Sequence, residues 1–284
     1  MESTAAYYDS LGNDALPGTG FVGVFAGDQL HPPMVDSERL QNPMFWKEGV
    51  KASTRLLANK MSLEQSSLVL DVGCGVGGVS LQLAEEYQCS CVGVNTCAKQ
   101  IATAQQIHAD RGILRNFFVQ ADALAMPFAA AQFSQVMCMN MAYLVPDHFA
   151  LFREMARCLA RGGFLGFDDW CITDQTTEDE IAELRTHWSC PNGFHTMEEY
   201  LQAAQAAGLQ VQWSRDCQSI GQELYTSPQR FQQFRTLYRP MAITMYGQER
   251  GTQVIEDFIG SWTRLGKLFQ NRHFGYYQVV FKKM

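Results

Sequence analysis

Short apolar runs alternate with helix-like segments through the middle of the chain. Runs with the length and composition of buried strands cover residues 68–72, 91–94, 117–120 and 133–139. Between them, apolar positions three and four residues apart predict helices that start near residue 79 and that cover 99–111 and 148–159. Strands separated by helices of this length predict a parallel sheet with right-handed crossovers.

The pattern is less regular after a further predicted strand at 164–167. A helix at 196–209 carries the N-cap signature of Thr196 with Glu199 three residues on, and Gly208 is its stop. Strands at 211–214 and 275–281 complete the series. The chain is therefore expected to be an α/β protein with a doubly wound, mostly parallel, seven-stranded sheet. Insertions at about 169–195 and 222–267 are expected to form a helical cap over the carboxyl edge of the sheet.

Residues 1–45 are rich in glycine and proline, which interrupt long helices and strands. We interpret this segment as an N-terminal arm or lid, followed by a main domain over 46–284 whose first helix lies within 43–60. The arm has little local reason to fold alone. It is therefore expected to pack over its own site or across a neighbouring subunit of a homo-oligomer.

Composition narrows the classes of partner. The formal net charge of −7 and the lack of a basic run argue against nucleic acid. No apolar stretch approaches the roughly 20 residues of a membrane span, and the start lacks the features of a signal peptide, so a cytoplasmic protein is expected. With 46% hydrophobic and 12% aromatic residues, the chain favours an apolar pocket for a small molecule.

Nine cysteines are scattered along the chain without a C-x-x-C pair. An odd number without zinc-site spacing indicates reduced, mostly buried thiols, and no metal site is expected.

A glycine-rich turn follows the first predicted strand and opens a helix. Gly73, Gly75 and Gly78 fit the dinucleotide pattern G-x-G-x-x-G, so a nicotinamide-dependent oxidoreductase is one hypothesis. Asp71, at the strand end, favours another, because a carboxylate repels pyrophosphate but complements the ammonium and sulfonium of S-adenosylmethionine. A non-catalytic module that binds this donor is a third hypothesis.

Polar residues also follow the next two strands. Asn95 lies 22 residues after Gly73, where a ribose would be met by a hydrogen-bonding side chain. Asp122 follows the strand at 117–120, where its carboxylate could accept a hydrogen bond from an adenine amino group. Three successive strand ends therefore predict one nucleoside pocket.

With these residues, the chain resembles the class I S-adenosylmethionine-dependent methyltransferases that act on small molecules, over about residues 43–217. The resemblance implies S-adenosylmethionine as cofactor. It implies contacts to the methionine moiety from Asp71, Gly73, Cys74, Gly75 and Gly77, to the ribose from Asn95 and Thr96, and to the adenine from Asp122, Ala123 and Leu124. It also implies that Asn140 and Met141 lie beside the donor sulfur and that Gln100 points back to the cofactor.

A finer resemblance rests on Tyr7, Tyr8 and Asp9, on Asn95, and on the helix at 196–209. These are similar to the branch of sterol, tocopherol, geranyl diphosphate and related prenyl C-methyltransferases. That branch implies C-methylation of a terpenoid or prenyl chain, including a prenyl chain already attached, as in teleocidin-type indole alkaloids. Met141 stands where the geranyl diphosphate enzymes have a glutamate. An N- or O-methyltransferase of a small metabolite is the alternative.

The acceptor residues are predicted from position. Methyl transfer needs an aligned acceptor more than it needs acid–base groups, and rings could stabilise a carbocation. The predicted substrate-binding residues lie in the arm, after strand ends or in the cap: Tyr8, Phe21, Tyr143, Trp170, His195 and Tyr200. The predicted catalytic residues are Tyr143, Tyr8 and His148, with His148 as the favoured proton acceptor.

Overall fold

The structure is a computed structural model. It describes residues 29, 32–34, 45–187, 190 and 192–284. Tyr8 and Phe21, predicted to bind substrate, lie outside the described residues.

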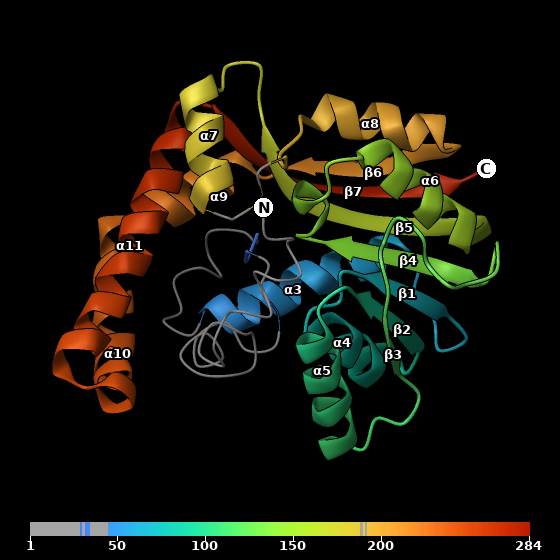
Figure 1. Cartoon of the computed structure of the whole chain (residues 1–284), viewed down its shortest axis with the longest axis horizontal. Coiled ribbons are helices and arrows are strands. Elements are labelled where there is room, and N and C mark those ends of the chain that lie inside the picture. Colours follow the sequence, from blue (N-terminus) through green and yellow to red (C-terminus); the bar gives the residue numbers. More distant parts are fainter. Residues whose placement is uncertain (1–28, 30–31, 35–44, 188–189, 191) are drawn as a thin grey trace.

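A seven-stranded sheet forms the centre of the molecule, in the order β3-β2-β1-β4-β5-β7-β6 (Figure 1). The strands β1 to β5 are parallel to one another, and β7 runs antiparallel to both of its neighbours. This confirms the predicted doubly wound, mostly parallel sheet. The strands are β1 (Leu68–Val72), β2 (Ser90–Asn95), β3 (Phe117–Gln120), β4 (Phe133–Met139), β5 (Leu159–Ile172), β6 (Leu209–Asp216) and β7 (Phe274–Lys283).

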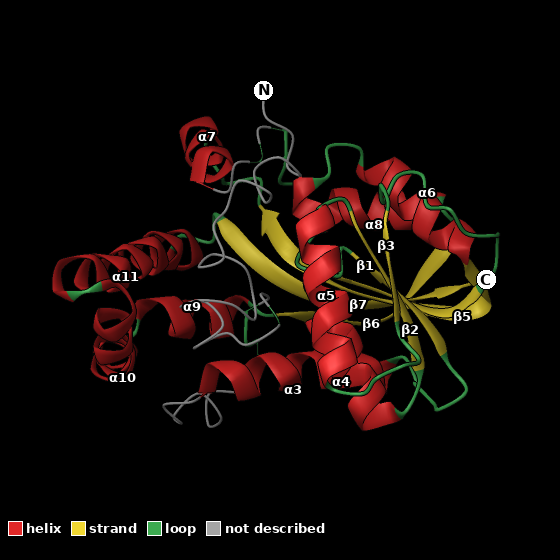
Figure 2. Ribbon diagram, turned by 60° about the horizontal axis from the view of Figure 1, so that its bottom comes forward, coloured by secondary structure: helices red, strands yellow, loops and turns green. Residues whose placement is uncertain are grey.

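Helices cover both faces of the sheet (Figures 1 and 2). One face carries α3 (Phe45–Lys60), α4 (Gly78–Tyr87) and α5 (Ala98–Asp110), and the other carries α6 (His148–Cys158) and α8 (Met197–Ala206). Each face has its own cluster of buried apolar side chains, so both faces of the sheet are shielded from solvent. The predicted capping box at Thr196 and Glu199 begins α8, and Gly208, with φ of 78°, follows its end.

β5 is much longer than the pattern predicted. The sequence limited this strand to 164–167, but β5 starts at Leu159, directly after α6, and continues through Ile172. Pairing explains the extension, because Phe133 of β4 is the partner of Leu159 and Phe274 of β7 is the partner of Ile172. Asp169 and Trp170 therefore belong to the sheet and not to the cap.

The cap consists of four helices, which extend from one end of the sheet (Figures 1 and 2). They are α7 (Glu178–His187), α9 (Gln218–Thr226), α10 (Pro228–Tyr246) and α11 (Gln248–Gln270). A buried cluster rich in aromatic residues joins the cap to α3 and to the sheet. Within it, the rings of Trp46 and Trp262 stack with centroids 5.0 Å apart.

The described part of the N-terminal segment packs against the main domain. The Gln29 Nε2 donates to the Gly78 carbonyl (3.0 Å) and to Gln82 Oε1 (2.8 Å), and Gln29 Oε1 accepts from the Thr54 hydroxyl (2.9 Å). Met34 is fully buried. These contacts tie the segment to the first turns of α4, which follows the glycine-rich loop.

All nine cysteines are buried and none forms a disulfide, as predicted. Among the described helices, none is long and apolar enough to cross a membrane. Cytoplasmic location and homo-oligomerisation stay predictions.

Candidate donor and acceptor sites

The carboxyl ends of β1, β2 and β3 meet at one edge of the sheet. The backbone N–H groups of Gly73 and Cys74 both donate to the Val94 carbonyl, at 2.9 and 3.0 Å. The N–H of Ala121 donates to the Asn95 carbonyl at 3.0 Å. These bonds bring the glycine-rich loop, Asn95 and the segment after β3 together, as the sequence predicted.

The glycine-rich loop has a backbone that only glycine adopts easily. Gly73, Gly75 and Gly77 have φ angles of 74°, 53° and 80°. A side chain at Gly75 would meet nothing within 4 Å, so this peptide faces open space. A Cβ at Gly73 would lie 2.3 Å from Cγ of Met141. The loop thus leaves its backbone accessible at Gly75 and has Met141 packed beside it, which fits a donor that passes between the loop and the end of β4.

Asp71 lies buried beneath this loop. The hydroxyl of Ser80, in α4, donates to Asp71 Oδ2 at 2.6 Å. Burial raises the pKa of Asp71 to about 6, against the opposing effect of the Ser80 hydrogen bonds. A cation bound nearby would favour the ionised carboxylate, so the site is electrostatically suited to a positively charged ligand.

The second and third strand ends offer polar groups. The Asn95 Nδ2 donates to Gln100 Oε1 at 2.5 Å, so Gln100 contacts the end of β2. Asp122 Oδ1 accepts from the N–H of Leu124 at 2.9 Å, and the Asp122 side chain is exposed. The Thr96 carbonyl accepts from Gln120 Nε2 at 3.0 Å.

The loop after β4 is held by an aspartate that sequence reasoning did not select. The N–H of Asn140 donates to the carbonyl of Asp168 (2.9 Å) and to its Oδ1 (3.1 Å). Asp168 is fully buried, and burial raises its pKa to about 7, although hydrogen bonds from Tyr276 and Gln278 oppose the rise. Two successive aspartates after an apolar run were the available signal. Asp168 was missed because the strand was predicted to end at 167.

Tyr143 and Trp170 belong to one group of rings, which we call the aromatic cluster: Tyr143, Trp170, Phe194, Phe274 and Tyr276. Tyr143 lies in the short helix η3 (Ala142–Leu144), and its N–H donates to Asp169 Oδ2 at 2.9 Å. Its ring stacks on Phe194 at 5.2 Å. Trp170 stacks on Phe274 at 5.4 Å and meets Tyr276 edge-on at 4.9 Å.

Three other predicted residues gather on the face of the sheet that α6 and α8 cover. The His148 ring lies 4.1 Å from the His195 ring and 6.0 Å from the Tyr200 ring, measured between centroids. Tyr200 is fully buried and packs on Phe167 at 5.1 Å. Burial lowers the pKa of His195, whose Nε2 lies 3.0 Å from the Val145 carbonyl. Within the described chain, no ring contact joins these three residues to the aromatic cluster.

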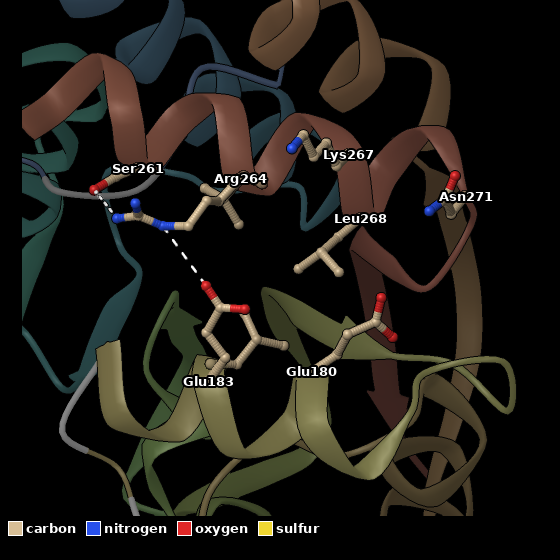
Figure 3. A pocket seen from close by; sticks show the side chains of 9 residues that line it. Glu180, Glu183, Ser261, Arg264, Lys267, Leu268 and Asn271 are labelled. Carbon is tan, nitrogen blue, oxygen red and sulfur yellow. Dashed lines mark hydrogen bonds and ion pairs between the residues drawn. The ribbon is translucent and has the colours of Figure 1, made fainter. Parts of the chain in front are cut away.

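A cavity of about 390 Å³ lies elsewhere, between α7 and α11. Figure 3 shows its charged lining, in which Arg264 Nε lies 3.8 Å from Glu183 Oε1. The cavity contains none of the predicted donor or acceptor residues. It is therefore not the site that the strand ends define.

The model of a family described as a methyltransferase domain matches residues 69–163, from β1 into β5. This match includes the glycine-rich loop, Asn95, Asp122 and Asn140, on the mostly parallel seven-stranded sheet that was predicted. The chain carries a class I S-adenosylmethionine-dependent methyltransferase domain. The pattern Gly73, Gly75 and Gly78 allowed either a nicotinamide cofactor or S-adenosylmethionine. The family match decides for S-adenosylmethionine, and the oxidoreductase hypothesis is wrong.

Known proteins similar to this methyltransferase domain fall in several groups. Cycloartenol-C-24-methyltransferase 1 of Oryza sativa subsp. japonica is 29% identical over 176 residues, which are 60% of this chain and 51% of that protein. The geranyl diphosphate C-methyltransferase from Streptomyces coelicolor A3(2), solved with Mg²⁺, geranyl diphosphate and S-adenosyl-L-homocysteine, matches with a TM-score of 0.70 and 17% identity, over 99% of this chain and 96% of that one. The phosphoethanolamine N-methyltransferase 2 of Haemonchus contortus, solved with S-adenosyl-L-methionine, matches with a TM-score of 0.80 and 14% identity, over 100% of this chain and 60% of that one.

These matches differ in what they show. The chain spans about half the length of the curated relatives that it matches. The two solved structures, at 17% and 14% identity, show the fold.

Proposed function

We propose that this protein transfers a methyl group from S-adenosylmethionine to a carbon atom of an apolar terpenoid or prenylated small molecule. The observation that carries the proposal is the position of the aromatic cluster. Tyr143 lies three residues after Asn140, in the loop that follows β4. An apolar acceptor on these rings would lie next to a donor held by the glycine-rich loop. The sterol methyltransferases among the relatives support an acceptor of this kind.

The donor would be held by the three strand ends. We assign the methionine moiety to Asp71 and the backbone of 73–77, the ribose to Asn95, Thr96 and Gln100, and the adenine to the segment Asp122, Ala123 and Leu124. When bound, S-adenosylmethionine supplies an electrophilic methyl group on a sulfonium. The Asp71 carboxylate, ionised more readily beside a cation, would orient the donor's ammonium. Met141 would pack against the donor because it already lies on the loop.

The acceptor side would control a carbocation. If an alkene carbon takes the methyl group, the new C–C bond forms as the C–S bond breaks with its electron pair left on sulfur, and positive charge develops on the acceptor. The faces of Tyr143 and Trp170 are suited to stabilise that charge. The cation then loses a proton to a base.

We assign the role of proton acceptor to Asp168 in preference to His148. Asp168 binds the N–H of Asn140, and its carboxylate is deeply buried with a pKa of about 7. It is on the same strand as Trp170, two residues away. His148, in contrast, contacts His195 and Tyr200 on the α6–α8 face.

N-methylation is a second candidate, and Asp168 also favours it. A buried carboxylate beside rings is suited to an amine, which is cationic before it gives up a proton. The fold shared with an N-methyltransferase is compatible with this candidate.

The test is product analysis with isotopically labelled donor. The full chain is incubated with a panel of sterols, prenylated indoles, prenylated phenols and alkylamines, and products are located by NMR. We expect label in a new C–CH₃ group of a prenylated or terpenoid acceptor. Transfer only to nitrogen or oxygen would overturn the C-methylation proposal while leaving the methyltransferase domain intact. A reaction without acceptor is the control for hydrolysis of the donor.

A further inference from the structure

The face covered by α6 and α8 holds a cluster of potential metal ligands that the proposed methyl transfer does not use. His148 begins α6, His195 precedes α8, and Glu199 lies in the first turn of α8. One ligand atom from each residue lies within 4.8 Å of the other two. His148 lies about 50 residues before His195 and Glu199 in the chain, so only folding brings the three together.

The hydrogen bonds in this cluster leave lone pairs available. Both ring nitrogens of His148 are buried and make no hydrogen bond within the described part of the chain. The side chain as a whole is 9% exposed. An imidazole that is shielded from water with neither nitrogen bonded is costly, because polar groups removed from water need partners. A bound ion would give these nitrogens the partner that the described residues do not supply.

The other two residues each have a second hydrogen-bond partner, as metal ligands in proteins usually do. His195 Nε2 lies 3.0 Å from the Val145 carbonyl, and an N–H donated there leaves the lone pair on Nδ1. Glu199 Oε2 accepts from the backbone N–H (2.7 Å) and hydroxyl (3.0 Å) of Thr196. Its other oxygen, Oε1, accepts no hydrogen bond among the described residues. Second partners of this kind fix a ring or a carboxylate before an ion binds.

We propose that His148, His195 and Glu199 bind one divalent transition-metal ion of the Zn²⁺ type. Two imidazoles and one carboxylate are a known ligand set for Zn²⁺, and three protein ligands leave a fourth position open. Ligand atoms on one tetrahedral ion lie about 3.4 Å apart, so side-chain movements of about 1 Å would close the cluster around it.

The ion would join the segment after η3 to the segment before α8. The same two segments are already linked by the Phe194 N–H, which donates to the Tyr143 carbonyl at 2.9 Å. Metal binding would therefore fix the backbone that positions Tyr143. Nothing in the spacing of these residues indicates the site, which is why the sequence predicted no metal.

Calorimetric titration of the chelator-stripped full chain with Zn²⁺, in the absence of donor, tests the proposal. We expect one ion to bind per chain and the melting temperature to rise on binding. His148→Ala should weaken binding at least tenfold. Glu199→Gln should do the same, and it keeps the helix cap because glutamine also completes a capping box. Unchanged affinity in the folded Glu199→Gln variant, or no binding by the wild type, would overturn the site.

His273→Gln is the matched control. His273 also lies beside a glutamate, with its Nδ1 2.8 Å from Glu180, but it is outside the cluster. We expect this variant to bind Zn²⁺ as the wild type does, and an equal loss there would mean that binding is not specific to the cluster. Co²⁺ substitution adds an independent readout. A thiolate-to-cobalt band would assign the ion to cysteine and refute the proposed ligands.

Discussion

The proposed donor half and the proposed acceptor half of the active site are built in different ways. The donor half consists of the glycine-rich loop, Asp71, Asn95 and Asp122, each at or just after the end of β1, β2 or β3. The acceptor half consists of the aromatic cluster and Asp168, which come from β5, β7, η3 and the segment before α8. In the first, backbone geometry and polar strand ends define the site. In the second, side chains from distant segments define it.

This difference predicts how each half responds to change. A donor site made of backbone fails when the backbone is forced to move, because peptide groups have no alternative rotamers. If the acceptor site is made of packed rings, a variant that lacks one ring should still fold and bind the donor. The rate of methyl transfer to the acceptor should fall.

The largest effect is expected from Gly73→Val. The variant combines an unfavourable φ of 74° with a Cβ only 2.3 Å from the Met141 side chain. We expect affinity for S-adenosylhomocysteine to fall by more than 100-fold, or about 3 kcal/mol. Calorimetric titration measures this. Gly162→Val is the control, because it has a φ of 78° and no atom within 4 Å of its Cβ. Wild-type affinity in Gly73→Val would show that the loop does not bind the donor.

Asp168→Asn should alter the pH dependence of stability. The ordinary pKa of 3.8 rises to about 7 in the fold, so the contribution of Asp168 to stability is present below about pH 4 and is lost as the pH rises through 7. The asparagine does not titrate, so the variant does not lose this stability as the pH rises. Between pH 4 and pH 8, the free energy of unfolding of the variant should therefore increase relative to that of the wild type by on the order of 3 kcal/mol.

Urea unfolding at the two pH values measures the change. Asp122→Asn, at an exposed site, is the control and should run parallel to the wild type. An equal pH slope in Asp168→Asn and the wild type would mean that Asp168 is not the buried acid that we describe.

Tyr143→Ala should slow turnover of the true acceptor about 10- to 100-fold, equivalent to about 1.4–2.8 kcal/mol, with little change in donor affinity. The ring stacks on Phe194, and its loss removes a surface that we propose contacts the acceptor. Tyr143→Phe separates two roles. Retained rate indicates that the ring face matters, and a loss as severe as in the alanine variant favours a hydrogen-bonded nitrogen or oxygen acceptor.

Asp71→Asn should have the smallest effect, a loss of about 1–2 kcal/mol in binding of S-adenosylhomocysteine at pH 8. Because the pKa of Asp71 is about 6 without ligand, wild-type affinity should rise as the pH increases through 6. The variant should not show that rise. Titrations at pH 5 and pH 8 compare the two proteins, and the same pH dependence in both would place the donor's ammonium elsewhere.

The sequence by itself indicated the residues that we propose for the donor half, and it determined most of the sheet. Residues 68–72, 117–120 and 133–139 were predicted as strands at their observed bounds. The N-cap of α8 at Thr196 was predicted together with its capping-box partner Glu199. These features are local. A glycine-rich turn, an apolar run or a capping box is specified by neighbours in the chain, so its signal is present before any folding.

Only the tertiary structure decided the acceptor half and the full length of β5. Asp168 and Trp170 became strand residues because β7, more than 100 residues later, pairs with them. Tyr143 and Trp170 share the aromatic cluster, whereas His148, His195 and Tyr200 contact one another beside α6 and α8. Such groupings depend on which face of a strand or helix each side chain occupies after long-range pairing. Residue type and position in the sequence do not show which of these side chains will share a face.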